Sequence, residues 1–257
     1  MISPERVHSD SRLRHWTKTV LDLAFIVLVV LAAKAAIAEP FYVPSGSMEP
    51  TLLIGDELLA TKYPYGYSTA SLPALFELPS SPRILAALPK RGDVVVFRWP
   101  GDRSQVWVKR VIGLPGDRIA MRGGHVLING AIAQSRPDGL GQMENETGAH
   151  MPAQRMIETL PGGRAHAIYK TVAREPLDNM AELTVPSGHL FVMGDNRDNS
   201  ADSRVPVRAG GVGLLPVADL VGRVDAVVGS WDLGMQSQPL WTWPQGLRLS
   251  RFFSAVD

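Results

Sequence analysis

One apolar segment near the N-terminus constrains the fold of this chain more than any other feature of its sequence. Residues Leu21–Ala38 are apolar except for Asp22 and Lys34. As an α-helix, the segment rises about 27 Å, close to the roughly 30 Å hydrocarbon core of a bilayer. Both charged residues lie near its ends, where side chains can reach the lipid headgroups. The segment predicts a single membrane-spanning helix, because no later part of the sequence is apolar over such a length.

The residues before this segment predict its orientation. Residues 1–19 contain four basic side chains and two acidic ones, namely Arg6, Arg12, Arg14 and Lys18 with Glu5 and Asp10. Basic residues beside a membrane span favour the cytoplasmic side. Residues 1–19 are therefore expected in the cytoplasm, residues 20–38 in the membrane, and residues 39–257 on the far side.

The same segment is also compatible with a removable signal peptide. Leu23–Ala33 is an uncharged run of the length of a signal-peptide core, and Ala36-Ile37-Ala38 has the small residues of a cleavage site. The pattern by itself leaves the anchor and the removable signal open. In both cases the bulk of the chain is exported.

The exported part is predicted to be mainly β. The chain contains 24 Gly and 20 Pro, and from Glu39 onward short β-like runs alternate with turn signals such as Asn129-Gly130. Residues 64–90 hold several prolines and predict an ordered loop, while residues 131–180 are polar and turn-rich and predict an insertion between two core strands. The predicted strands are Asp93–Phe97, Gln105–Ile112, His125–Ile128, His189–Met193 and Leu220–Val228.

Composition excludes several classes of function. The chain has no Cys, which rules out disulfides, thiolate metal sites, iron–sulfur clusters and a cysteine nucleophile. A formal net charge of +1 gives no electrostatic footprint for nucleic acid, so no nucleic-acid partner is expected.

Two segments each offer one reactive side chain. In Pro44–Leu52, Ser47 is flanked by Gly, Pro and small residues, which allows a tight turn with an exposed hydroxyl; the alternative is an ordinary loop. On a strand, Lys109 shares an apolar face with Trp107 and Val111. Burial there would lower the lysine pKa and yield a neutral amine that acts as a base. The alternative is a lysine whose amine reaches solvent at a sheet edge.

A third segment, Met193–Arg204, is dense in charged, Asn and Ser side chains. A calcium loop is one interpretation, because Asp195, Asp198 and Asp202 are hard oxygen ligands. The spacing does not match an EF-hand, and two arginines in the segment offset the charge, so no metal or cofactor is predicted. The loop is instead suited to orient the Lys109 amine.

Together the three segments favour a serine nucleophile with a lysine base, a known variant of the catalytic triad. A Ser-His-Asp arrangement is disfavoured, because none of the six histidines lies in a motif.

These residues carry a resemblance to a known family. Pro44–Asp56, Arg91–Phe97, Val108–Asp117 and Gly194–Arg204 resemble, in order, the signature boxes of the bacterial type I signal peptidases, also called leader peptidases. The resemblance covers the apolar segment through about Val228, and residues 131–180 match poorly. It implies a β-rich, membrane-bound serine endopeptidase of the bacterial inner (cell) membrane. Such an enzyme removes signal peptides from exported preproteins after Ala-X-Ala-type sites, with membrane lipid as its other partner. The resemblance also favours a retained membrane anchor over a removable signal peptide.

The resemblance also implies roles for individual residues. Ser47 matches the nucleophile, Lys109 the general base, Ser200 the hydroxyl that orients the amine, and Ser45 a donor of the oxyanion hole. Two further groups match by position. The substrate-pocket positions are Val43, Met48, Leu52 and Trp107, and the structural ion-pair positions are Arg110, Asp195, Asp202 and Arg204.

Two regions depart from the family or fall outside its boxes. Val205–Leu214 interrupts the stretch where the family has an aromatic residue, which bears on substrate preference. Near the C-terminus, aromatic side chains cluster with two arginines and predict either core packing or contact with the membrane surface. These side chains are Trp231, Trp241, Trp243, Phe252 and Phe253, with Arg248 and Arg251.

Two alternative functions remain open. One is a specialised relative that processes a single pilin or conjugation substrate. The other is a membrane-anchored binding module without catalysis, which would require the combination of Ser47, Lys109 and Ser200 to be accidental.

Overall fold

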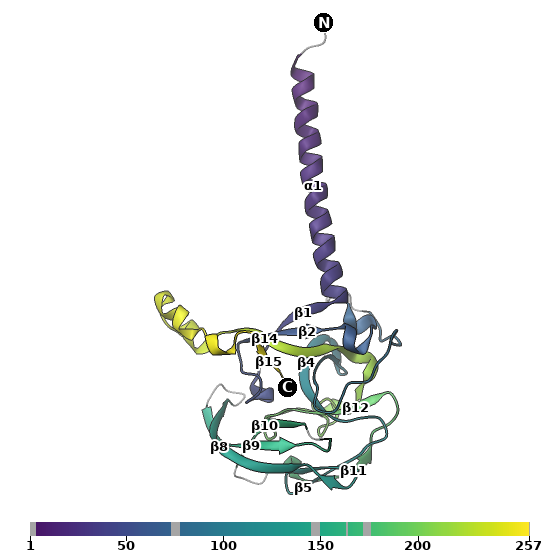
Figure 1. Ribbon diagram of the computed structural model, residues 1–257, viewed down its shortest axis with the longest axis vertical. Coiled ribbons are helices and arrows are strands. Elements are labelled where there is room, and N and C mark those ends of the chain that lie inside the picture. Colours follow the sequence, from purple (N-terminus) through teal and green to yellow (C-terminus); the bar gives the residue numbers. More distant parts are fainter. Residues whose placement is uncertain (1–3, 73–77, 145–149, 163, 172–175, 257) are drawn as a thin grey trace.

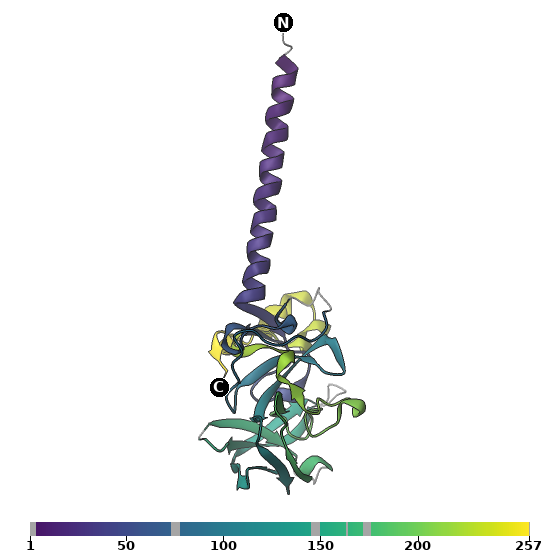
Figure 2. The same ribbon diagram turned by 90° about the vertical axis from the view of Figure 1, so that its right-hand side faces the viewer.

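A single long helix stands on a β-rich body. The computed structural model describes residues 4–72, 78–144, 150–162, 164–171 and 176–256. Helix α1 (Pro4–Ala36) projects away from the body in both views of the ribbon (Figures 1 and 2). Its stretch His15–Ala32 has a mean hydropathy of 1.7 and the length of a membrane span, and none of it is buried against the body. The predicted N-terminal apolar helix and the mainly β class are confirmed.

The helix differs from the prediction at both ends. It begins at Pro4, so that most of the basic N-terminal segment continues the same helix instead of preceding it. It ends at Ala36, two residues before the predicted boundary, because Ala38 already pairs with Thr61 at the start of strand β1. The hydrogen bond from Lys62 N to the Ile37 carbonyl (2.9 Å) completes this change from helix to strand.

The largest sheet forms the centre of the body. Its strands run in the order β1–β2–β14–β3–β4–β12–β13, and β15 pairs with β14. All pairs in it are antiparallel, which agrees with the hairpin-like connections expected from the many turn residues. The bounds are β1 (Ala38–Tyr42), β2 (Asp56–Thr61), β3 (Val94–Trp99), β4 (Asp102–Gly113), β12 (His189–Met193), β13 (Leu215–Pro216), β14 (Leu220–Ser230) and β15 (Ser254–Ala255).

Two smaller sheets lie between β4 and β12 in the sequence and at the end of the body away from α1 (Figure 1). One has the order β11–β5–β6–β7 and the other β10–β9–β8. Their bounds are β5 (Arg118–Arg122), β6 (His125–Ile128), β7 (Ala131–Ile132), β8 (Gln134–Glu144), β9 (His150–Thr159), β10 (Ala165–Lys170) and β11 (Met180–Thr184).

Short 3₁₀ helices make most of the remaining regular structure in the described residues. They are η1 (Gly46–Met48), η2 (Tyr63–Tyr65), η3 (Thr69–Ser71), η4 (Pro176–Asp178), η5 (Val207–Ala209), η6 (Val217–Asp219), η7 (Leu233–Ser237), η8 (Leu240–Gly246) and η9 (Leu249–Arg251). Of the predicted loop over residues 64–90, the part at 73–77 lies outside the described residues, and the rest contains η2, η3 and a bridge between Tyr67 and Ile84.

The five predicted strands are all present, as β3, β4, β6, β12 and β14. The predicted Asn129-Gly130 turn connects β6 to β7, with φ of 54° and 82° at its two residues. Positive φ at both central positions is the conformation that an Asn-Gly hairpin turn favours.

The polar stretch 131–180 has more regular structure than predicted, because β8, β9 and β10 lie within it. Its strands did not stand out in the sequence for two reasons. Prolines and glycines interrupt β8, whose register shifts between Pro137 and Leu140. Much of the sheet is also exposed or half-buried, so that it lacks a continuous alternation of apolar side chains. Backbone pairing, rather than burial of apolar side chains, defines these strands.

Strand β3 is buried on both faces and separates two parts of the core. Val94 and Val96 pack with Val43, Met48 and Leu52 on one side. Val95 and Phe97 pack with Val111 and Leu190 on the other. This alternation follows from the two-residue period of a strand. It fixes the neighbouring strand β4, which carries Lys109, in the centre of the molecule.

Candidate active site

Ser47 lies on a tight turn directly after β1. The turn is the 3₁₀ helix η1, and Ser45 precedes it in an extended conformation. Buried Gly46 and Met48 anchor the turn on both sides of the serine, which itself stays half-buried. The backbone then returns to β2, since Val43 N donates to the Asp56 carbonyl (2.9 Å). The local sequence thus presents the Ser47 hydroxyl from a rigid turn.

Lys109 lies opposite this turn on β4. Its side chain is only 4% exposed, and its Nζ donates to Ser47 Oγ (2.8 Å) and to the Val108 carbonyl (3.1 Å). The Nζ also lies 5.6 Å from the centre of the Trp107 ring. Burial lowers the pKa of Lys109 to about 8, against the opposing attraction of the Asp202 and Asp195 carboxylates. A hydroxyl and an amine of lowered pKa are therefore in direct contact.

The Gly194–Arg204 loop leaves the sheet beside Lys109, because Met193 of β12 pairs with Arg110 of β4. Arg110 and Asp195 form a buried ion pair with two hydrogen bonds of 2.8 Å. Arg204 and Asp202 form a second buried pair at 2.8 Å, and Asp202 also accepts from Gly194 N (3.0 Å). These pairs tie the two ends of the loop to the sheet and to each other.

Asn196 is a site residue that the sequence reasoning did not single out. Its backbone N–H donates to the Ser47 carbonyl (3.2 Å), and its Nδ2 donates to the Gly46 carbonyl (3.1 Å). Asn196 is fully buried, so these two bonds hold the serine turn from inside the protein. The one sequence feature that could have indicated this role is the position of Asn196 inside the Gly194–Arg204 segment. An Asn in a polar segment usually lies in a solvated turn, so its burial was not expected.

A groove of about 890 Å³ contains the Ser47–Lys109 contact. Its walls come from the end of β1 and the following loop, from β4, and from the Gly194–Arg204 loop. Val43 and Trp107 line it, whereas Met48 and Leu52 do not line it and pack with Val43 in the core. Ser45 also lines the groove, and its Oγ lies 3.4 Å from Ser47 Oγ.

Ser200 lines the same groove but does not bond to the lysine. Its Oγ is buried and has no hydrogen-bond partner within the described part of the chain. Ser200 packs against Gly194, where an added Cβ would overlap Ser200 Oγ.

The segment Val205–Leu214 supports one wall of the groove. Trp99 Nε1 donates to the Gly211 carbonyl (2.9 Å), and the Trp99 ring stacks on Trp107 with the ring centres 5.0 Å apart. Val205 itself lines the groove. The segment Val205–Leu214, which departs from the family pattern, therefore contacts the wall of the groove.

Comparison with known proteins decides the family. The family described as signal peptidase, peptidase S26, matches residues 14–231. The chain belongs to this family. Signal peptidase I of Rickettsia typhi is 35% identical over 251 residues, which cover 90% of each protein, and that of Rickettsia canadensis is similar to the same extent. A solved signal peptidase I from Enterococcus faecalis is 25% identical, with a TM-score of 0.32, and the match covers 54% of this chain and 97% of that one. The resemblance based on the four sequence segments is confirmed.

As a member of the S26 signal peptidases, the chain is a peptidase, and the Ser47–Lys109 groove is its candidate active site. Of the residues that the resemblance singled out, the structure brings Ser45, Ser47, Lys109, Ser200, Val43 and Trp107 to this groove. Arg110, Asp195, Asp202 and Arg204 lie behind it as the two ion pairs.

Gly194 offers a sharp test of this geometry. A Cβ at Gly194 would overlap both the Ser47 carbonyl oxygen and the Ser200 hydroxyl. We expect Gly194→Ala to push the serine turn away from Lys109 and to lower kcat of peptide cleavage by about 10²-fold, the effect of a misplacement of about 1 Å. Steady-state kinetics and thermal unfolding of the purified variant would measure this.

Gly229→Ala on β14 is the matched control, because its added Cβ would meet Glu57 atoms only at ordinary contact distances of 3.7 Å and above. Unchanged kcat in Gly194→Ala would contradict the packing of the loop against the serine turn.

Proposed function

We propose that this chain is a membrane-anchored serine endopeptidase that removes signal peptides from exported preproteins by cutting after Ala-X-Ala-type sites. The observation that carries the proposal is the 2.8 Å contact between Lys109 Nζ and Ser47 Oγ inside the groove of an S26 family member. The relatives named signal peptidase I supply the class of substrate.

In the proposed reaction, Ser47 is the nucleophile and Lys109 the general base. The neutral amine takes the hydroxyl proton while Ser47 Oγ attacks the scissile carbonyl, and then gives that proton to the leaving amine. This forms an acyl-enzyme between Ser47 and the signal peptide. Lys109 next takes a proton from a water molecule that attacks the ester, and returns it to Ser47 Oγ as the bond between that oxygen and the acyl carbon breaks. The signal peptide leaves with a free carboxyl group, and both Ser47 and Lys109 return to their starting states. No cofactor is required.

Ser45 and the backbone N–H of Ser47 are the proposed donors to the oxyanion. Ser45 Oγ lies 3.4 Å from the attacking oxygen, Ser47 Oγ, and the backbone N–H belongs to the same residue as that oxygen. Donors fixed in place before the reaction stabilise the developing charge without reorganisation. Ser200 is the proposed orienting hydroxyl for the Lys109 amine, supported by its place in the same groove and by its buried Oγ, which is unpaired in the part of the chain described.

The substrate is proposed to bind extended along the groove. The segment Phe41–Gly46 and the strand residues Gln105–Val108 both line it, and either edge offers backbone groups to an added strand. Val43 and Trp107 restrict the room beside Ser47, which favours small side chains such as alanine. Met48 and Leu52 act by fixing the wall, as their place in the core suggests.

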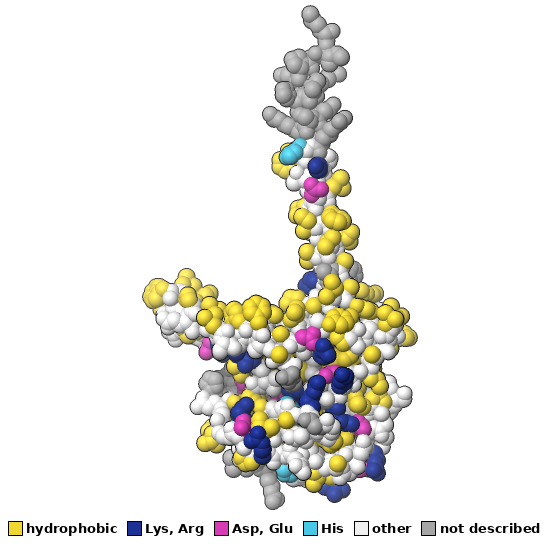
Figure 3. All heavy atoms as spheres, in the orientation of Figure 1, with side chains coloured by type: hydrophobic (Ala, Val, Ile, Leu, Met, Phe, Trp, Pro, Cys, Tyr) yellow, Lys and Arg dark blue, Asp and Glu magenta, His cyan; other side chains and the backbone are white. Residues whose placement is uncertain are grey.

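The proposed topology places residues 1–19 in the cytoplasm, the part of α1 from residue 20 onward across the bacterial inner (cell) membrane, and residues 39–257 as the catalytic domain on the outer face. Basic residues before the span support this orientation. Ser47 follows Ala38 by nine residues, so an extended chain keeps it within about 30 Å of the bilayer. Apolar side chains gather around the base of α1 and along the segment that follows β14, residues 231–256 (Figure 3), which supports contact with membrane lipid. In that segment Trp241 is 81% and Phe253 79% exposed.

Cleavage of a preprotein tests this function. The full-length protein in detergent is incubated with a preprotein that has an Ala-X-Ala site, and mass spectrometry locates the new N-terminus. We expect a single cut after the second alanine. If a folded sample cuts none of several unrelated preproteins, the proposal is contradicted. Cutting of one pilin-type substrate alone would favour a specialised relative.

A further inference from the structure

The sheet formed by β8, β9 and β10 contacts the Gly194–Arg204 loop. Tyr169, near the end of β10, forms a parallel bridge with Asn196. Its N–H donates to the Asp195 carbonyl (2.9 Å), and its carbonyl accepts from Arg197 N (3.0 Å). The loop that holds the serine turn is therefore itself paired, through its backbone, to a strand of this smaller sheet.

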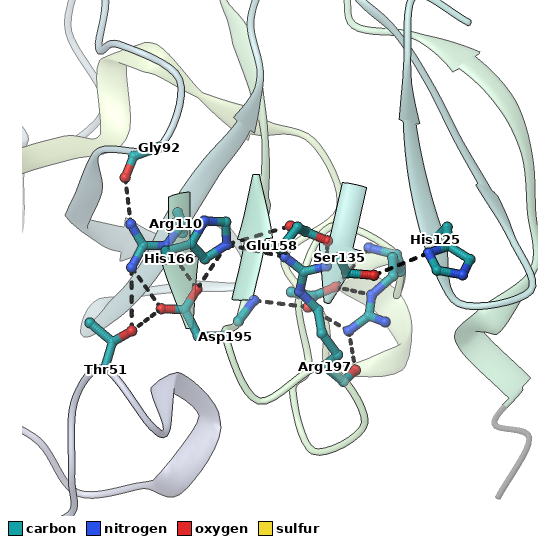
Figure 4. A network of polar contacts seen from close by, with 12 residues as sticks. Thr51, Gly92, Arg110, His125, Ser135, Glu158, His166, Asp195 and Arg197 are labelled. Carbon is teal, nitrogen blue, oxygen red and sulfur yellow. Dashed lines mark hydrogen bonds and ion pairs between the residues drawn. The ribbon is translucent and has the colours of Figure 1, made fainter. Parts of the chain in front are cut away.

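A buried ion pair reinforces this contact. Glu158 on β9 accepts two hydrogen bonds from the Arg197 guanidinium, one of them from Nη1 to Oε1 at 2.7 Å (Figure 4). Both side chains are at most 2% exposed. Burial by itself opposes the charged form of Glu158, but the Arg197 guanidinium outweighs it and lowers the pKa of that carboxyl. Two buried charges with this geometry fix the loop in one position.

His166 on β10 fills the space between this pair and Asp195. Its Nε2 lies 3.4 Å from Glu158 Oε2 and 3.9 Å from Asp195 Oδ1 (Figure 4). Burial lowers the pKa of His166 to about 4, so the ring is neutral at neutral pH and adds no charge to the cluster. It acts as a spacer that packs the Glu158–Arg197 pair against the Arg110–Asp195 pair.

A second attachment lies further along the loop. Asp198, which lines the groove, accepts from Thr171 N (2.6 Å) and from Lys170 Nζ (3.3 Å). The end of β10 and the residue after it thus hold the loop at Asp195, Arg197 and Asp198. The three contacts are spaced along one continuous stretch of the loop.

We propose that Glu158 is a positioning residue for Ser47, which acts through Arg197 and through the hydrogen bonds of Asn196 to the Gly46 and Ser47 carbonyls. The inference rests on the proposed function, in which Ser47 is the nucleophile. It assigns a task to the β8–β10 sheet: this sheet supports the loop and keeps Ser47 Oγ within reach of Lys109. Loss of the support lowers the rate of the chemical step, because small displacements of reacting atoms have large effects on it.

The test is the kinetic behaviour of Glu158→Gln in the full-length protein in detergent, with a peptide that contains an Ala-X-Ala site. We expect kcat to fall about 10- to 100-fold while KM stays within about threefold of the wild type, because the groove that binds the peptide is intact. Single-turnover formation of the acyl-enzyme should slow by the same factor. Wild-type kcat in folded Glu158→Gln would overturn the inference.

Two further variants keep the test decisive. Asp138→Asn makes the same carboxylate-to-amide change in the ion pair with Arg155, also on the β8–β10 sheet, and should keep wild-type kcat. The double variant Glu158→Leu/Arg197→Met removes both charges, so no unpaired charge is left buried and the fold is retained. We expect its kcat to be as low as that of Glu158→Gln, and wild-type kcat there would also overturn the inference. An inactive wild type would instead refute the proposed function.

Discussion

Replacement of Ser47 by alanine is expected to lower kcat by at least about 10⁴-fold, with little change in KM. Ser47 Oγ is the only hydroxyl that Lys109 Nζ contacts among the described residues, at 2.8 Å, so no neighbouring side chain takes over as nucleophile. Alanine removes a single oxygen and leaves η1 and the buried anchors Gly46 and Met48 in place. The measurement is steady-state cleavage of a peptide with an Ala-X-Ala site, with thermal unfolding recorded alongside.

Two serine variants control this experiment. Ser187→Ala changes an exposed serine in the turn before β12, outside the groove, and should have wild-type kinetics. Ser45→Ala removes a proposed oxyanion donor, and we expect an intermediate loss of about 10²- to 10³-fold. If Ser47→Ala keeps activity at the level of Ser45→Ala, another group is the nucleophile.

Replacement of Lys109 by methionine is expected to lower kcat by at least about 10³-fold, because it removes the only base in contact with Ser47 Oγ in the described part of the chain. Methionine has a similar length and is uncharged, so it fits the buried position beside Trp107. We therefore expect the variant to fold and to bind peptide with unchanged KM. Lys90→Met, at an exposed lysine, is the matched control and should have wild-type kinetics.

The pH dependence of the wild type tests the same residue without a mutation. Lys109 acts as a base only when neutral, and burial lowers its pKa to about 8. The rate should rise about tenfold per pH unit below pH 8, as the fraction of neutral amine grows, and level off above it. A profile that still climbs near pH 10, where an exposed lysine titrates, would mean that the amine is not desolvated during the reaction.

Local patterns in the sequence predict most of the large elements. The apolar run from Leu21 predicts α1, because a helix that crosses a bilayer must be apolar on all sides and of fixed length. The short runs rich in Val and Ile in β3, β4 and β14, separated by Gly and Pro, predict strands, because β-branched side chains favour extended backbone and Gly and Pro favour turns. Elements without such a pattern were missed. Strand β8 is polar and interrupted by a proline and two glycines, and β9 contains a proline, so that pairing among β8, β9 and β10 defines these strands.

The sequence also predicts the reactive residue types, from Ser47 in a turn with Gly and Pro, Lys109 on an apolar strand, and the charged Gly194–Arg204 segment. Only the tertiary structure places them in one groove, since Ser47 and Lys109 are 62 residues apart in the sequence. The same holds for Met48 and Leu52, which sequence matching put near the substrate and which the structure places in the core.

The sequence alone determined the membrane-length helix, the β class and the family, because periodicity and contiguous motifs depend on near neighbours in the chain. The tertiary structure alone decided which polar residues are buried together. Glu158 lies 39 residues before Arg197, and Asn196 lies 150 residues from Gly46. A charged or amide side chain is usually exposed, so nothing local marks these residues as interior. The pairing of β10 with the Gly194–Arg204 loop brings Arg197 to Glu158, and the packing of that loop against the serine turn brings Asn196 to Gly46, which makes the burial of these polar groups stable.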